Sequence, residues 1–125
     1  MRQKLVLEYP IQSSPKVLYP RLSTPGGLQE WFADGVNLKG KNFIFVWEGV
    51  EQIAEVIAKK ENRYMRFRWI EEEDEDAWFE FRINIDELTQ DVALVIIDMI
   101  EDGDEDDATE LWNSQITALK HVIGL

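Results

Sequence analysis

The sequence contains no cysteine and only one histidine. The first absence excludes disulfides, thiol nucleophiles and thiolate metal sites. The second leaves no histidine cluster for a metal, and no Ser-His-Asp pattern or glycine-rich phosphate loop is present either. The single histidine, His121, is predicted one residue off the apolar face of a helix, where a surface position is expected. We therefore expect a protein that is not an enzyme and that needs no cofactor.

Basic residues are also scarce, because 13 Lys and Arg stand against 25 Asp and Glu, giving a net charge of −12. Phosphate groups are bound by clustered Lys and Arg, so nucleic acid and anionic membrane surfaces are disfavoured as partners. No apolar run approaches membrane-spanning length, and Met1–Lys4 does not resemble a signal peptide. We expect a cytoplasmic protein without membrane insertion.

Hydrophobic residues are plentiful at 45%, and aromatic residues reach 11% of the 125 positions. This length supports a core without metals or disulfides, so we expect one domain, residues 1–125. The clearest helix is predicted at Asp104–Leu125, begun by Asp106 or Asp107 with Glu110 completing a capping box. Its apolar face needs a large surface to pack on, and the strands before it supply one. That face consists of Ala108, Leu111, Trp112, Ile116, Leu119, Val122 and Ile123.

Period-two alternation predicts seven strands, and two short helices are predicted to start at Ser14-Pro15 and Thr24-Pro25. Most links between strands are short, which indicates an antiparallel sheet and an α+β fold. The predicted strands are Gln3–Tyr9, Val36–Lys39, Asn42–Trp47, Gln52–Lys59, Arg63–Ile70, Trp78–Asp86 and Asp91–Ile100.

Alternation also predicts which side chains share a face of the sheet. Met65, Phe67 and Trp69 are expected opposite the set that begins with Phe79 and Phe81, which leaves Glu80 opposite an arginine, Arg66 or Arg68, on the outer face. The next strand, from Val92 to Ile97, is apolar on both sides. We expect an outer apolar patch that includes Ile70 and that is either covered, for example by a second copy of the chain, or stays exposed. The residues predicted for such a homodimer are Trp78, Leu94 and Ile96.

Several local motifs carry a family resemblance: Ser13-Ser14-Pro15, Ser23–Leu28, Glu30–Asp34, Phe45–Gly49, Phe67-Arg68-Trp69 and Leu94–Asp98. The predicted order is one strand, two short helices, six strands and a long helix. With this order and these motifs, the chain resembles the START-like, or helix-grip (SRPBCC), superfamily, which includes the birch-pollen allergens, the polyketide cyclases and the activator of the heat-shock protein ATPase. Together the motifs resemble the small bacterial START-like proteins, many of them from Bacteroidetes-type genomes. The resemblance implies a seven-stranded curved antiparallel sheet wrapped around the long C-terminal helix, with two short helices after the first strand.

The resemblance also implies a groove between helix and sheet that often holds an apolar ligand. Bulky inward residues either line this groove or fill it as plain core. Two functions follow from the two alternatives: binding of a small hydrophobic ligand in the groove, or a co-chaperone-like interaction module that acts through its surface. The candidate ligand-binding residues are Trp31, Phe45, Trp47, Phe67, Trp69, Phe79, Phe81 and Trp112.

Two acidic runs, residues 71–76 and 101–107, are separated by two strands and are therefore expected at the same end of the sheet. Clustered carboxylates can hold a hard cation such as Ca²⁺, although the EF-hand pattern fails here because Asp107 and Asn113 stand where it needs Gly and Glu. The other interpretation is a solvated anionic end. Nearby, Asp98 is a candidate inward carboxylate with a raised pKa, but its facing stays open.

Overall fold

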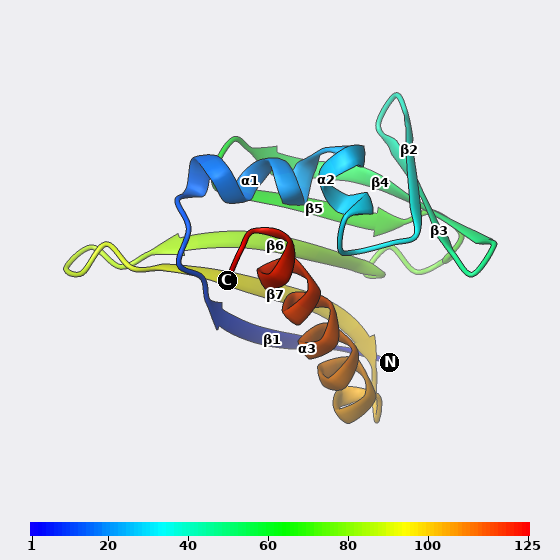
Figure 1. Ribbon diagram of the computed structural model, residues 1–125. Coiled ribbons are helices and arrows are strands. Elements are labelled where there is room, and N and C mark those ends of the chain that lie inside the picture. The colour runs from blue at the N-terminus through cyan, green and yellow to red at the C-terminus, as the bar shows by residue number, and fades with distance from the viewer.

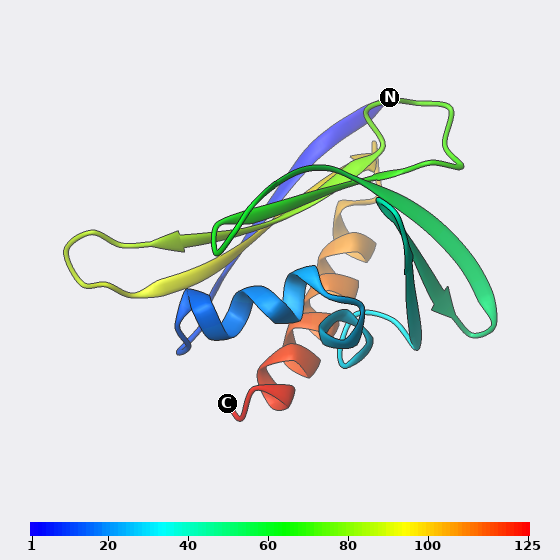
Figure 2. The same ribbon diagram turned by 90° about the horizontal axis from the view of Figure 1, so that it is seen from above.

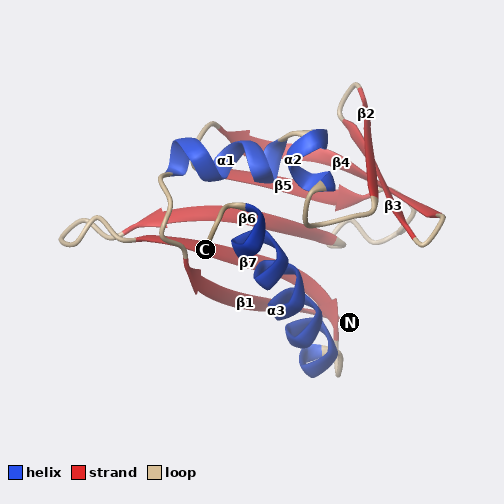
Figure 3. Ribbon diagram, viewed as in Figure 1, coloured by secondary structure: helices blue, strands red, loops and turns tan.

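The computed structural model describes residues 1–125 as a curved sheet with helices on one side (Figures 1 and 2). The sheet has the order β1-β7-β6-β5-β4-β3-β2, with every neighbouring pair antiparallel. Figure 3 separates the strands from the three helices by colour. The elements are β1 (Arg2–Pro10), α1 (Pro15–Ser23), α2 (Pro25–Gln29), β2 (Gly35–Lys39), β3 (Asn42–Trp47), β4 (Val50–Lys60), β5 (Tyr64–Trp69), β6 (Trp78–Ile85), β7 (Val92–Glu101) and α3 (Glu105–Val122).

The two short helices start where the Ser-Pro and Thr-Pro pairs predict. The Ser14 hydroxyl accepts a hydrogen bond from the Val17 N–H at 3.2 Å, and the Thr24 hydroxyl accepts one from the Gly27 N–H at 3.0 Å. Thr24 precedes a proline and is held in an extended conformation, so α1 ends there and α2 begins directly after it.

The long helix begins before its predicted capping residues. Asp104 is its N-terminal flanking residue, not Asp106 or Asp107, and the Asp104 side chain makes no capping hydrogen bond. Gly103, at φ +95°, reverses the chain immediately after β7, so the helix starts as soon as the strand ends. Acidic residues then occupy the whole first turn, where the positive end of the helix dipole favours them. The buried face contains Trp112, Ile116 and Leu119.

The predicted parity of the register between β5 and β6 is confirmed. Phe67 lies opposite Phe79, and Arg66 lies opposite Glu80 on the outer face. Glu80 is nevertheless only 1% exposed, because its carboxylate accepts hydrogen bonds from Arg66 Nε at 2.9 Å and Arg82 Nε at 2.8 Å. The Arg66 guanidinium in turn lies 3.8 Å over the ring of Trp78. Long side chains of the sheet itself therefore cover this part of its outer face.

The outer position predicted for Leu94 and Ile96 is wrong. Ile96 pairs with Phe81 and Leu94 pairs with Ile83, and residues directly opposite in an antiparallel sheet point the same way. Both side chains therefore lie on the concave face, where their exposure is 0%. Trp78 does lie on the outer face, half-buried beside Arg66. The homodimer surface predicted from Trp78, Leu94 and Ile96 does not exist in that form.

Candidate functional site

Aromatic rings from the three strands β3, β5 and β6, from the α2–β2 loop and from α3 converge on the concave side of the sheet. Phe32 lies at their centre, with its ring 5.0 Å from Phe45 and 5.8 Å from Trp112, centroid to centroid. Four of the eight predicted ligand-binding residues, Trp31, Phe45, Phe67 and Phe81, are buried in this cluster and border no groove. These four side chains are part of the buried core cluster.

The other four predicted residues, Trp47, Trp69, Phe79 and Trp112, border an open groove between α3 and the sheet. Its volume is about 450 Å³. Trp47 and Trp69 are half-buried, so their rings combine packing with access to the groove. The full lining is Phe32, Trp47, Gln52, Trp69, Phe79, Asp98, Ala108, Leu111, Trp112 and Gln115.

Hydrogen bonds fix two of the three indole rings in this lining. Trp47 Nε1 donates to the backbone carbonyl of Phe32 at 2.8 Å, and Gln115 Nε2 donates to the same oxygen at 3.2 Å. Trp112 Nε1 donates to the Asp98 carboxylate at 2.8 Å. These bonds join β3, β7 and α3 across the groove, so its shape is set before any ligand arrives.

Asp98 is the only ionisable side chain in the aromatic part of the groove. It pairs with Phe79 across the sheet, which places it on the concave face. Burial raises the pKa of Asp98 above its ordinary value, while the hydrogen bond from Trp112 and the positive charge of Arg2 oppose that rise. The sequence had left the direction of this side chain open.

A second cavity of about 550 Å³ continues the groove toward the start of α3. It shares five lining residues with the aromatic part: Gln52, Trp69, Asp98, Ala108 and Leu111. Its lining contains six carboxylates, Glu71, Glu72, Asp98, Glu101, Asp104 and Asp107, so we call it the acidic mouth.

Arg2 joins the two acidic runs at this mouth. It forms ion pairs with Glu72 at 3.5 Å and Asp74 at 3.0 Å in the first run, and with Glu101 at 3.5 Å in the second. The prediction that both runs lie at the same end of the sheet is confirmed. No group of three or more His, Asp or Glu side chains is arranged to hold a metal ion.

Sequence reasoning missed several groove residues. Leu111 and Ala108 belong to the predicted apolar face of the helix but not to the predicted site, and Leu111 is 60% exposed. Phe32 belongs to the apolar residues of the predicted second short helix, but α2 ends at Gln29, and Phe32 packs into the core from the loop that follows. Gln52 faces inward because it pairs with Phe45, and polar residues at such positions give no signal in the sequence.

The remaining surface does not contain the predicted ligand-binding residues. A cavity of about 810 Å³ lies among strand ends and loops, including Ile11, Arg63 and Asp86, and contains none of the predicted aromatic residues. His121 is exposed near the C-terminus of α3. None of the helices combines the length and apolarity required to cross a bilayer.

Comparison with known proteins identifies the fold. Among solved structures, the chain is 35% identical to BfR322 from Bacteroides fragilis, with 99% of this chain and 93% of that one covered at a TM-score of 0.70. It is 17% identical to Aha1 from Colwellia psychrerythraea, solved as a dimer, with 94% and 93% covered and a TM-score of 0.78. It is 19% identical to MLL2253 from Mesorhizobium loti, with 97% of this chain and 96% of that one covered and a TM-score of 0.79.

The comparison with curated proteins finds no match. The family model described as START-like superfamily domain matches residues 1–125, the whole of this sequence. With this match, the 35% identity to the Bacteroides fragilis protein and the sheet-and-helix arrangement described above, the chain belongs to the START-like superfamily.

Proposed function

We propose that this domain is a non-enzymatic binding protein that holds a small, largely apolar molecule in the groove between α3 and the sheet. The observation that carries the proposal is the cavity of about 450 Å³ bordered by Phe32, Trp47, Trp69, Phe79 and Trp112. Small-molecule sites commonly have volumes of about 300–1,000 Å³, mostly apolar walls and a few placed polar groups. This groove has those properties.

The packed aromatic cluster behind the groove supports the same proposal. Phe79 stacks on Phe67 with centroids 4.9 Å apart, and both rings are buried. A ligand would therefore meet a rigid floor, and binding would order few protein side chains. The proposal is for binding without chemistry because the aromatic wall offers one carboxylate and two amides but no nucleophile paired with a base.

The test is to fill the groove from the helix side. Ala108 borders both the aromatic part and the acidic mouth, so Ala108→Phe places a ring in the groove. We expect the affinity for the neutral fluorescent probe N-phenyl-1-naphthylamine to fall by about tenfold or more, because the ring occupies the volume that the probe needs. Titration of probe fluorescence measures this, with circular dichroism to check the fold.

The matched control is Ser114→Phe, which adds the same ring to an exposed position of the same helix that does not line the groove. This variant should bind the probe as the unaltered protein does. Equal loss in both variants, or full binding by Ala108→Phe, would contradict the groove as the binding site.

A surface interaction module is the second candidate. Exposed apolar side chains favour it, since Val6 of β1 is 54% exposed and Ile70, after β5, is 37% exposed. A partner bound there would be insensitive to Ala108→Phe, which separates the two functions. A homodimer through the outer face is one form of this proposal, and light scattering of the purified protein tests it.

A further inference from the structure

The walls of the groove have a chemistry more specific than apolarity. Trp69 and Phe79 have centroids 5.1 Å apart, and Trp112 lies 6.2 Å from Phe79, so three π-systems adjoin one another along the wall. The negative faces of such rings, indoles above all, attract organic cations. Together they form an aromatic wall, in which Phe79 and Trp112 are buried and the half-buried Trp69 is the ring most accessible to an alkylated ammonium group.

A carboxylate lies within this wall. Asp98 borders both the aromatic part of the groove and the acidic mouth. Trp112 Nε1 is its only side-chain hydrogen-bond donor, so most of its acceptor capacity remains for a ligand. An ammonium group placed here would meet an opposite charge and aromatic faces together.

The approach to this position is negatively charged as well. Arg2 is the only basic residue in the lining of the acidic mouth, and three carboxylates already engage it. The aromatic part of the groove contains no basic residue. Clefts lined by one sign of charge concentrate ligands of the opposite sign and exclude ligands of the same sign. An anionic ligand such as a fatty acid would have no charged partner here.

We propose that the natural ligand is a small organic cation, in which an amine or alkylated ammonium group is attached to a short apolar body. This inference rests on the proposed function of the groove and specifies its ligand class. The cationic group lies beside Asp98 against Trp69 and Trp112, and the apolar body extends toward Trp47 and Phe32. The inference rests on the aromatic wall and its carboxylate. The acidic mouth attracts a cationic ligand toward them.

The experiment compares three probes with the same six-carbon chain: hexyltrimethylammonium, 1-hexanol and hexanoate. Isothermal titration calorimetry of the full chain measures their affinities. We expect the ammonium to bind about tenfold or more tightly than the alcohol, and hexanoate to bind least, because only the ammonium gains from the carboxylate and the indole faces. Added salt should reduce the difference in affinity between the ammonium and the alcohol, because it screens the charge interaction.

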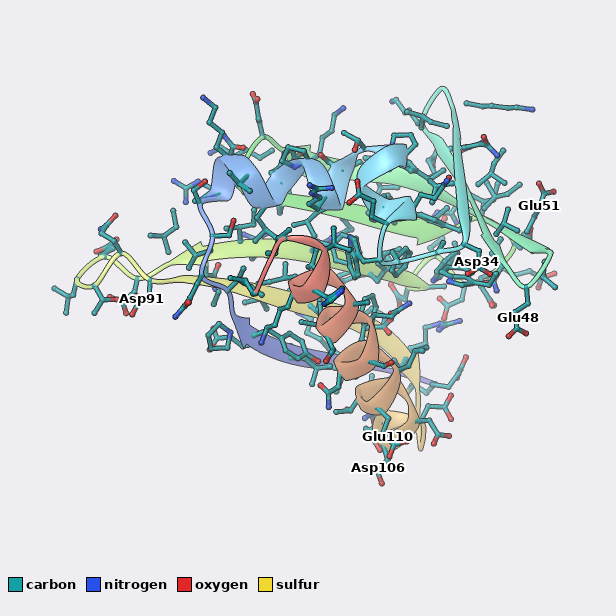
Figure 4. All side chains as sticks on the ribbon, in the orientation of Figure 1. Asp34, Glu48, Glu51, Asp91, Asp106 and Glu110 are labelled. Atoms are coloured by element: carbon teal, nitrogen blue, oxygen red, sulfur yellow. The ribbon has the colours of Figure 1, made fainter.

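Asp98→Asn tests the role of the carboxylate, since the amide oxygen can still accept the Trp112 hydrogen bond. This change should lower the ammonium affinity about tenfold and leave hexanol affinity unchanged. The matched control is Asp91→Asn, an equal change in charge at the base of the β6–β7 loop, remote from the labelled residues at the start of α3 (Figure 4). It should leave all three affinities unchanged.

The outcomes separate this inference from the proposed function. If hexanol or hexanoate binds as tightly as the ammonium, the groove still binds ligands and the cation assignment is wrong. If none of the three binds, both proposals fail together. Tighter binding of Nα-acetyl-lysine amide than of hexyltrimethylammonium would overturn the small-molecule assignment in favour of a lysine side chain from a protein.

Discussion

Asp98 links the stability of the protein to the chemistry of its groove. Because burial raises the pKa of Asp98, the folded state holds this proton more tightly than the unfolded state does. The folded state therefore loses stability, relative to a protein without this group, as the pH rises from the unfolded pKa through the raised folded pKa. A buried carboxylate with a raised pKa is a common feature of binding and catalytic sites.

We therefore expect the stability of Asp98→Asn relative to the unaltered protein to be greater at pH 7 than at low pH, because only the unaltered protein loses stability as the pH rises through the raised pKa of Asp98. The charge-dependent part of the difference should disappear near pH 3, below both pKa values, because asparagine and protonated aspartate are both neutral there. Urea denaturation of both proteins at the two pH values measures this difference. A variant that is less stable by the same amount at both pH values would show that packing, not charge, dominates at this position.

At the scale of single residues, the sequence predicted which face of the sheet a side chain lies on wherever apolar and charged residues alternate strictly. Phe79 and Phe81 alternate with charged neighbours, so their inward direction was predictable. Leu94 and Ile96 lie in a strand that is apolar on both sides, so hydrophobicity could not assign their face. Their direction is set by pairing with Ile83 and Phe81, which depends on the length of the preceding turn.

Among the elements, α1 and α2 meet closely at a single glycine. A Cβ built on Gly27 would lie 2.7 Å from the Cα of Arg21 and closer still to the Pro20 carbonyl oxygen. Both are backbone atoms, so they cannot move aside as a flexible side chain can. The packing of the two helices therefore requires glycine at this position.

We expect Gly27→Ala to lower the free energy of unfolding by about 1–3 kcal/mol or more, because the added methyl group forces α1 and α2 apart. Thermal or urea denaturation measures the loss. Gly26→Ala is the control, since its Cβ would meet no atom within 4 Å. The control should be neutral or more stable by up to about 1 kcal/mol, through a less flexible unfolded chain. Similar losses in both variants would contradict the close contact.

The order of elements was predictable because each carried a local signal. Thr24-Pro25 predicted the start of α2, and period-two alternation predicted all seven strands to within about two residues. The first turn of α3 was less predictable. Asp104, Asp106 and Asp107 are equally suitable as capping residues. The choice among them depends on where β7 ends and where Gly103 reverses the chain direction.

For the whole molecule, the sequence indicated an aromatic concave face but not which part of it stays open. Trp31, Phe45, Phe67 and Phe81 are packed in the core, whereas Trp47, Trp69, Phe79 and Trp112 border the groove. All eight share the same residue types, so no pattern along the chain separates them. The division arises from where α3 lies over the sheet and where Phe32 enters, which are tertiary properties.

The acidic mouth is also a property of the whole fold. Residues 71–76 and 101–107 are far apart along the chain, and Arg2 at the start of β1 joins them. The sheet topology brings these three segments to the entrance of the aromatic groove. A negative entrance and an aromatic interior thus form one continuous surface.

Native mass spectrometry of the protein purified from its own host tests the central claim most directly. We predict an added mass on the unaltered protein, retained by Ser114→Phe and lost from Ala108→Phe, because only the second ring fills the groove. Under the cation assignment, the released molecule carries an amine or alkylated ammonium group. Protein that carries no added mass, or a mass that persists in Ala108→Phe, would contradict a groove built to hold a ligand.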